Sequence, residues 1–227
     1  MLQIGLDPYD TGRLSPFGDY GVAPFGPPLS SASLARRPEV EAAILGNSTI
    51  QHLNPVRLTR LTNLHFVSLS MQATGPLEQL AVGRWLVRHH DGKSAKSLAV
   101  LVIDIDTRWC RGDGTIELTH PFPFWLYSDS DLFYAANLVS LGTFSATARK
   151  VKTILGLKPP IWSNGYRDYD DTYNKTDLLG GIRGYELLGQ NFAGMQYLKE
   201  FLTEVPADTL VILLHPPRYY FSLPASG

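Results

Sequence analysis

The residues best suited to chemistry stand in a short turn, Gly46-Asn47-Ser48, that directly follows the apolar run from Glu41 to Leu45. A glycine after a strand permits a tight turn, and a serine two positions later can stand at the mouth of the following helix. Backbone N–H groups at a helix start stabilise an oxyanion. The pattern favours Ser48 as a nucleophile. Its alternative is that Asn47 or Ser48 only caps the next helix.

Two carboxylates belong to the end of the most apolar segment, Leu98 to Ile105. Alternate residues of a strand share a face, so Asp104 and Asp106 are candidates for a general acid pair or a magnesium site. Open α/β sheets hold ligands at the carboxyl ends of their strands, so we expect both aspartates on the same crevice rim as Asn47. The alternative is that these acids cap the next helix.

The histidines differ in their positions. His215 stands at the end of the apolar run from Leu210 to Leu214, where it could serve as a general base. The prolines that follow it, Pro216-Pro217, are equally typical of a plain turn. His89 and His90 are neighbours near the end of a predicted helix and point apart, which argues against a metal pair. We therefore expect no metal site there.

The elements that must position these residues alternate along the chain. We expect strands at Glu41–Leu45, Leu64–Ser70, Leu98–Ile105 and Leu210–Leu214, and helices after Asn54 and at Leu77–His90, Asp131–Leu141, Phe144–Leu155 and Ala193–Thr203. This alternation predicts a three-layer α/β/α sandwich around a mainly parallel, flavodoxin-like sheet. The strand over 98–105 is almost continuously apolar, so we expect it at the sheet centre.

Three regions fall outside this alternation. Residues 1–40 are dense in proline, glycine and aromatic residues, which predicts an extended N-terminal arm lying on an α/β domain over 41–227. The stretch from Pro121 to Tyr127 holds two further prolines and is expected to be an aromatic loop over the crevice or a packed surface segment. A polar, tyrosine-rich stretch from Trp162 to about Gly184 predicts a long loop.

Composition narrows the function class. The chain has 227 residues, of which 44% are hydrophobic, enough for one sizeable core. Its formal net charge is −1 and its lysines and arginines are scattered, so nucleic-acid binding is not indicated. The single cysteine, Cys110, excludes an intrachain disulfide. Since no run of about 18 apolar residues occurs, we expect a soluble protein, with an anchor upstream of this sequence as the alternative.

The run Ile44-Leu45-Gly46-Asn47-Ser48 resembles the first sequence block of SGNH/GDSL-type hydrolases, in the bacterial cell-envelope branch that includes alginate and other polysaccharide O-acetylation proteins. The resemblance continues through Leu69 to Gln72, Val102 to Asp106 and Leu213 to Pro217, and so spans most of the chain. It implies a periplasmic or cell-envelope esterase or O-acyltransferase that acts on acyl esters of glycans without a cofactor. It is also compatible with membrane anchoring through an upstream segment.

The same resemblance implies that Ser48 is the nucleophile and that its own amide, with donors at Gln72 and Gly75, forms the oxyanion hole. This sequence has Asn47 where the family usually has aspartate, Gln72 near an expected glycine, and Asp106 near an expected asparagine. The Asp-x-x-His pair that supplies the family's base is absent after the fourth expected strand. The resemblance therefore implies a domain that lacks its last strand and helix and is inactive as it stands or uses another base.

Two alternatives from other classes stay open. A catalytically silent module of the same fold would bind carbohydrate or a protein through the aromatic segments Pro121 to Tyr127 and Tyr166 to Tyr173. A flavodoxin-like or response-regulator-like domain would use Asp104 and Asp106. The second alternative is weakened because no Gly-rich, phosphate-binding loop follows the first expected strand.

Overall fold

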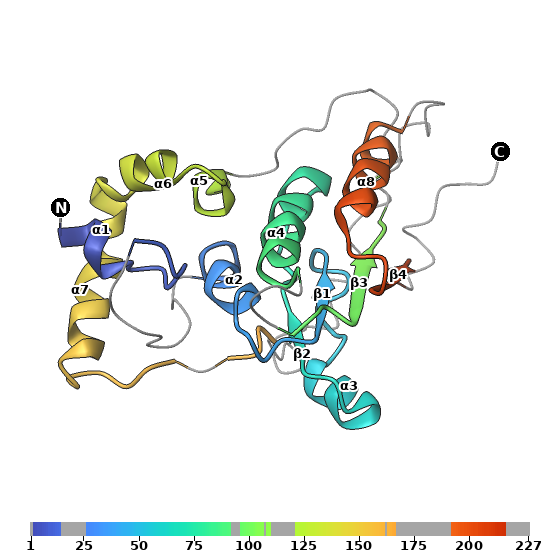
Figure 1. Ribbon diagram of the computed structural model, residues 1–227, viewed down its shortest axis with the longest axis horizontal. Coiled ribbons are helices and arrows are strands. Elements are labelled where there is room, and N and C mark those ends of the chain that lie inside the picture. Colours follow the sequence, from blue (N-terminus) through green and yellow to red (C-terminus); the bar gives the residue numbers. More distant parts are fainter. Residues whose placement is uncertain are drawn as a thin grey trace, which may run out of the picture.

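The computed structural model describes residues 2–14, 26–91, 96–106, 108–109, 121–161, 163–166 and 192–216. At its centre is a parallel sheet with the strand order β2-β1-β3-β4 (Figure 1). The strands are β1 (Ala42–Leu45), β2 (Phe66–Ser68), β3 (Val100–Asp104) and β4 (Leu210–Leu214). Because every pair is parallel, the carboxyl ends of all four strands meet at one edge of the sheet.

Helices cover both faces of the sheet. The helices of the described residues are α1 (Leu2–Leu6), α2 (Pro27–Ala35), α3 (Pro55–Thr62), α4 (Pro76–His89), α5 (Phe124–Tyr127), α6 (Asp131–Leu138), α7 (Leu141–Ile154) and α8 (Ala193–Glu204), and α6 and α7 pack on α1 beside the sheet. Helices α2, α4 and α8 lie on one side and α3 on the other (Figure 1). The predicted α/β class with a parallel sheet is confirmed, and the arrangement is consistent with a three-layer, flavodoxin-like fold.

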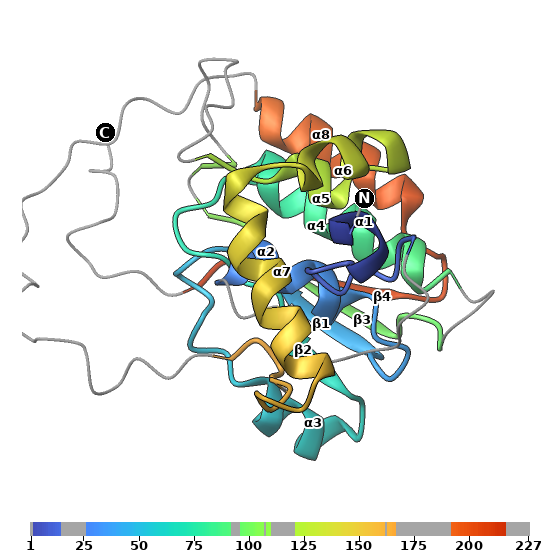
Figure 2. The same ribbon diagram turned by 90° about the vertical axis from the view of Figure 1, so that its left-hand side faces the viewer.

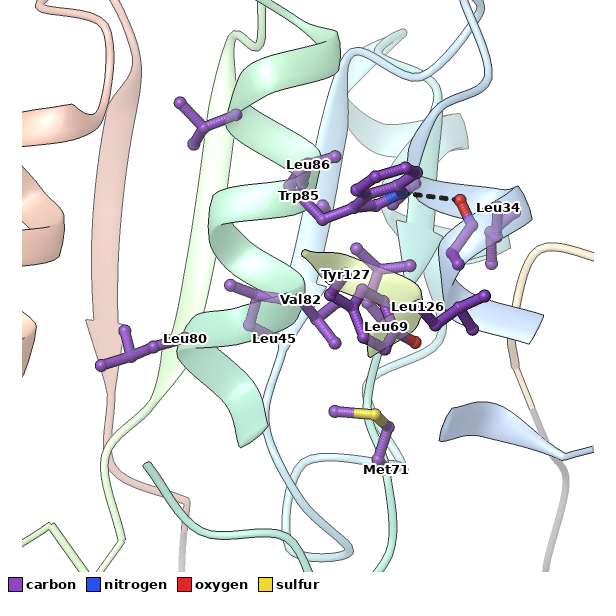
Figure 3. Close-up of a cluster of buried hydrophobic side chains, with 14 of the residues drawn as sticks. Leu34, Leu45, Leu69, Met71, Leu80, Val82, Trp85, Leu86, Leu126 and Tyr127 are labelled. Atoms are coloured by element: carbon purple, nitrogen blue, oxygen red, sulfur yellow. Dashed lines mark hydrogen bonds between the residues drawn. The ribbon is translucent and has the colours of Figure 1, made fainter. Parts of the chain in front are cut away.

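The strand register divides the core into two clusters. Ala43 and Leu45 of β1 point into the larger cluster, between the sheet and helices α2 and α4. Figure 3 shows this cluster around Trp85, whose indole N–H donates to the Ala32 carbonyl at 2.8 Å. Ala42 and Ile44 point the other way, into the smaller cluster beneath α3. A strand buried on both faces explains why β1 reads as an unbroken apolar run.

The start of α3 follows the local sequence closely. The Asn54 side chain accepts hydrogen bonds from the amides of Val56 and Arg57, at 2.9 and 3.2 Å, and Pro55 occupies the first turn. The helix ends at Asn63, whose φ of 59° places it in the left-handed region. The predicted Asn cap followed by proline is thus confirmed, because the free amides of a first turn need an acceptor.

The prediction of an extended N-terminal arm is wrong for the residues that the structure describes. Residues 27–35 form α2, with Pro27 and Pro28 in its first turn, where the missing N–H costs nothing. Leu34 and Ala35 are buried in the larger cluster. This part of the chain therefore belongs to the domain core.

The aromatic stretch near residue 124 is a packed segment, the second of the two expected alternatives. Its last four residues form the short helix α5, which contacts α2, α4 and α6. Leu126 and Tyr127 are buried, and the Tyr127 hydroxyl donates to the Pro28 carbonyl at 2.6 Å. Its rings contribute to the core rather than to a crevice.

One side of the sheet is bordered by a short segment at residues 163–166. The amide of Ser68, in the outer strand β2, donates to the Asn164 carbonyl at 2.7 Å. Gly165 has a φ of +79°, and a Cβ there would overlap the Ser68 carbonyl, so glycine is required. Most of the long loop expected after Trp162, including Tyr173, lies outside the described residues.

Candidate functional site

The turn after β1 is fixed first by a close backbone approach. A Cβ at Gly46 would lie 2.5 Å from the Asp104 Cβ and 2.6 Å from the Ile50 Cγ2, so only glycine fits. The Gly46 carbonyl accepts the Met71 amide at 2.9 Å, which extends the pairing of β1 and β2 beyond both strands. The turn is thereby held between the ends of β2 and β3.

A buried hydrogen-bond network then fixes Asn47. Its Nδ2 donates to the Asp106 Oδ2 at 2.6 Å, and its Oδ1 accepts the Thr49 amide at 2.9 Å. The Thr49 hydroxyl lies 2.6 Å from the Asp104 Oδ2 and 2.8 Å from the Asn47 Oδ1, and its single proton serves one of these acceptors at a time. The structure thus brings together Asn47, Asp104 and Asp106, the three residues expected on the crevice rim.

These contacts give the two aspartates a role that neither sequence interpretation included. Asp104 and Asp106 hold the turn after β1, and Asp106 also accepts the Arg108 amide at 2.9 Å through its Oδ1. Within the described ranges no group of three or more His, Cys, Asp or Glu side chains is arranged to hold a metal ion.

Ser48 is the exposed member of this turn. Its neighbour Asn47 is 2% exposed, whereas Ser48 faces solvent and receives no hydrogen bond from another described side chain. Helix α3 begins only at Pro55 and is capped by Asn54, so Ser48 does not stand at a helix mouth. Both predictions about that helix are wrong: neither Asn47 nor Ser48 caps it, and its amides do not stabilise an oxyanion at Ser48.

The two other predicted oxyanion donors lie in the loop after β2. The Gly75 amide donates to the Glu78 Oε2 at 3.0 Å at the start of α4, and so it already has an acceptor. Gln72 is exposed at the same loop. The Arg108 guanidinium donates to the Thr74 carbonyl at 2.7 Å and ties this loop to the end of β3.

His215 reaches the same edge from β4. Its ring Nδ1 lies 2.6 Å from the Ile105 carbonyl, which can only accept. In the neutral ring Nδ1 therefore carries the proton and Nε2 keeps its lone pair, the arrangement a general base needs. Strand β3 lies between β1 and β4, so the ends of β1 and β4 are roughly 10 Å apart, and no hydrogen bond joins Ser48 to His215.

The histidine pair at the end of α4 belongs to the core. The ring nitrogens of His90 lie 2.8 Å from the Ala35 carbonyl and 3.2 Å from the Lys96 carbonyl. His89 packs on Trp85 and contacts the Trp85 carbonyl through Nδ1 at 2.8 Å. Burial lowers the pKa of His89 because it disfavours the charged ring. The two rings thus contact different neighbours.

Sequence reasoning missed two members of the edge, Thr49 and Arg108. The signal for Thr49 was local, because an Asn followed two residues later by Thr is typical of a turn in which the Asn side chain accepts the later amide. The contact of Arg108 with the loop after β2 had no local signal. This contact depends on the spatial order of the strands in the sheet, which places the ends of β2 and β3 on either side of β1.

Comparisons with protein-family models, with curated proteins and with solved structures found no match to this chain. The likeness to SGNH/GDSL hydrolases therefore rests on the motifs given above. Any functional argument has to come from the geometry of the sheet edge at which all four strands end, which we call the carboxyl edge.

Proposed function

We propose that the carboxyl edge of the sheet is a serine esterase or O-acyltransferase site for acyl esters of glycans, with Ser48 as the nucleophile. One observation carries the proposal: Ser48 is exposed on a turn whose preceding residue, Asn47, is buried and anchored by side-chain hydrogen bonds to both sides. A nucleophile has to be open to substrate and yet held in place, because its orientation sets the rate of attack.

The reaction would proceed through an acyl-enzyme. The Ser48 Oγ attacks the acyl carbonyl carbon while a base takes the hydroxyl proton, and the bond to the departing sugar oxygen then breaks. That oxygen receives the proton and leaves as an alcohol. Water or a second sugar hydroxyl then removes the acyl group from Ser48, which distinguishes an esterase from an acyltransferase. The Ser48 amide and the exposed residue Gln72 are the remaining candidates for stabilising the oxyanion.

His215 is the candidate base, because the Ile105 carbonyl fixes the tautomer in which Nε2 can accept a proton. The end of β3 lies between His215 and Ser48. The proton of the Ser48 hydroxyl therefore has to reach the His215 ring through a water molecule or a group of the substrate. A positioned base typically contributes about a hundred- to ten-thousand-fold to the rate. Replacing His215 by Gln is the direct test of this role.

The experiment is hydrolysis of p-nitrophenyl acetate, followed by mass spectrometry of the peptide that contains Ser48. We expect the wild type to hydrolyse the ester and to carry one acetyl group on this peptide after rapid quenching. Ser48→Ala should abolish both signals, whereas Ser145→Ala, at an exposed serine of α7, should change neither. Hydrolysis above background that survives Ser48→Ala would disprove the nucleophile.

A second candidate function is non-catalytic binding of a glycan or protein at the same edge. It is favoured by the Gly75 amide, which is already bonded to Glu78 in the position proposed for an oxyanion donor. On this alternative no acyl-Ser48 forms. An acetylated oligosaccharide then binds equally well to wild type and Ser48→Ala in calorimetric titration.

A further inference from the structure

Helix α7 is inverted with respect to an ordinary surface helix. Its buried side carries Thr143, Thr147 and Lys150 beside Ala146, whereas Phe144 on its outer side is 68% exposed, together with Ser145 and Lys152. Leu155, directly after the last turn, is 65% exposed. A surface helix normally places apolar residues inward and polar residues outward. The outer side of α7 thus presents apolar area that the fold does not bury.

The polar side of α7 is inward because its partners are there. Lys150 pairs with the buried carboxylate of Asp10, and the Thr143 hydroxyl donates to the Leu138 carbonyl at 2.7 Å. The Thr147 hydroxyl donates to the Thr143 carbonyl at 2.9 Å. Turning the helix to bury Phe144 would break the ion pair with Asp10. The outward apolar face is therefore fixed by the packing of the domain.

Helix α6 and the residues after α7 extend this face. We call the whole the α6–α7 surface, and its apolar members are Leu132, Phe133, Val139, Phe144, Leu155 and Leu157. They are six of the thirteen large apolar side chains that are exposed in the described part of the chain, so the exposure is concentrated here. In Figure 2, α7 runs across the near side of the molecule with α6 above it.

The charge of this surface is mainly positive, with Asp131 at the start of α6 as its exposed acid. No aspartate or glutamate occurs between Leu132 and Arg167, although the whole chain has a formal net charge of −1. Lys152 and Lys158 are exposed within the same stretch, and Arg149 is half-buried beside them. The nearest acid in sequence, Asp131, opens α6 and lies 3.9 Å from the Arg13 guanidinium. Cations thus accompany the exposed apolar side chains.

We propose that the α6–α7 surface binds peripherally to an anionic lipid bilayer. Exposed leucine and phenylalanine side chains beside lysines suit the boundary between acyl chains and negatively charged headgroups. A second copy of this chain fits less well, because a two-fold interface would bring two surfaces of like charge together. None of the helices in the described residues combines the length and the apolar character that spanning a bilayer requires.

The test is flotation of the protein with vesicles of phosphatidylcholine alone and with vesicles of equal parts phosphatidylcholine and phosphatidylglycerol. We expect binding to the anionic vesicles that falls as salt is raised. Each charge removed should weaken binding by about fivefold, so the double variant Lys152→Gln, Lys158→Gln should lose about 25-fold. The variant Phe144→Ser, Leu157→Ser should lose at least about tenfold, because two apolar side chains no longer enter the bilayer.

The matched control lies on α3, which packs on the other face of the sheet from α2 and α4 (Figure 1). Leu61 there is 72% exposed, close to the 70% of Leu157, and Arg60 supplies an exposed cation. The variant Leu61→Ser, Arg60→Gln should bind anionic vesicles like the wild type. All variants change exposed residues, so their thermal unfolding should match that of the wild type.

Three results would overturn the proposal. The first is no binding to anionic vesicles by a folded wild type, and the second is an equal loss in the α3 control, which would indicate non-specific adsorption. The third is a dimer in light scattering that Phe144→Ser dissociates, since the surface would then be covered by a second copy. Because the Ser48 chemistry is not used in the assay, failure here leaves the esterase proposal untouched.

Discussion

The described part of the molecule has two pairs of buried aspartates that differ in what they hold in place. Asp7 and Asp10 lie in a loop after α1, where Asp10 pairs with Lys150 and Asp7 accepts from Thr11, Gly12 and Tyr134. Asp104 and Asp106 lie at the carboxyl edge and accept from the turn that carries Ser48. The first pair fixes a loop to helices α6 and α7, whereas the second supports an exposed hydroxyl. Burial of an acid alone therefore does not mark a site.

The backbone sharpens this contrast. The first loop holds Asp7, Asp10 and Leu14 in the left-handed region, with φ of 42°, 51° and 52°. Each such residue costs stability, so the loop persists because its carboxylates are bonded to the helices around it. At the carboxyl edge the constraint is instead the close packing around Gly46, which leaves no room for a Cβ atom. We expect changes in the first region to act on stability and changes in the second to act on activity as well.

The largest effect is expected from Lys150→Met, which leaves the Asp10 carboxylate buried without its ammonium partner. Removing one member of a buried ion pair typically costs about 3–5 kcal/mol. The free energy of unfolding in urea should fall by that amount, while the ester hydrolysis of the folded protein stays unchanged. Lys152→Met, at an exposed position of the same helix, is the control and should be nearly neutral. If Lys150→Met and Lys152→Met had the same free energy of unfolding, the ion pair of Asp10 would not stabilise the fold, and the proposed difference between the two aspartate pairs would be wrong.

Gly46→Ala should have the next largest effect. The added Cβ meets the Asp104 Cβ at 2.5 Å and the Ile50 Cγ2 at 2.6 Å, and overpacking of this kind costs about 1–3 kcal/mol. The turn has to shift, so ester hydrolysis should fall even in folded protein, as measured by the rate per active molecule. Gly5→Ala has open space around the new Cβ and should leave both quantities unchanged.

A smaller loss of stability is expected for Asp106→Asn. The replacement keeps the shape of the side chain but can set an amide group against the Asn47 Nδ2, which costs about 1–2 kcal/mol for the lost hydrogen bond. Since Asn47 orients the turn, the rate of ester hydrolysis should fall more steeply than stability does. A variant with full activity and reduced stability would show that the second aspartate pair, like the first, is structural.

The smallest effect concerns pH and His89. Burial lowers the pKa of His89 in the folded protein, while the unfolded chain binds the proton near pH 6.5. As pH falls below that value the unfolded state takes up the proton first, so stability declines towards the folded pKa. His89→Gln should remove this part of the acid sensitivity, as measured by urea unfolding at neutral and mildly acidic pH. Above neutral pH the ring is uncharged in both states, and this contribution to the pH dependence vanishes.

Much of the fold followed from local pattern. Strand β4 and helix α8 begin where the sequence predicted, and α8 ends one residue later than expected, because apolar spacing defines them. Helix α2 is not predicted from the sequence, because prolines are also typical of an extended arm. Pro27 and Pro28 stand in the first turn of α2, where proline is compatible with a helix. The buried residues of the helix, which include Leu34 and Ala35, do not recur at the clear helical spacing that would have predicted it.

The site was harder to predict than the fold. Asn47, Asp104 and Asp106 were expected on one rim because parallel strands end together. Their mutual hydrogen bonds depend on β1 and β3 being neighbours, and β2 lies between them in sequence but not in space. The helix-mouth argument for Ser48 failed because residues 48–54 form a connection long enough to move α3 away from the turn.

The bond between Ser68 and Asn164 also has a consequence for the order of folding. Strand β2 pairs with β1 across a short stretch of chain, whereas its outer contact joins residues almost a hundred positions apart. Closing a longer loop costs more chain entropy and slows the formation of the contact. The β1–β2 pairing should therefore form early and the outer border of β2 late, so that the Ser68 amide gains its protection from exchange only when the rest of the domain has assembled.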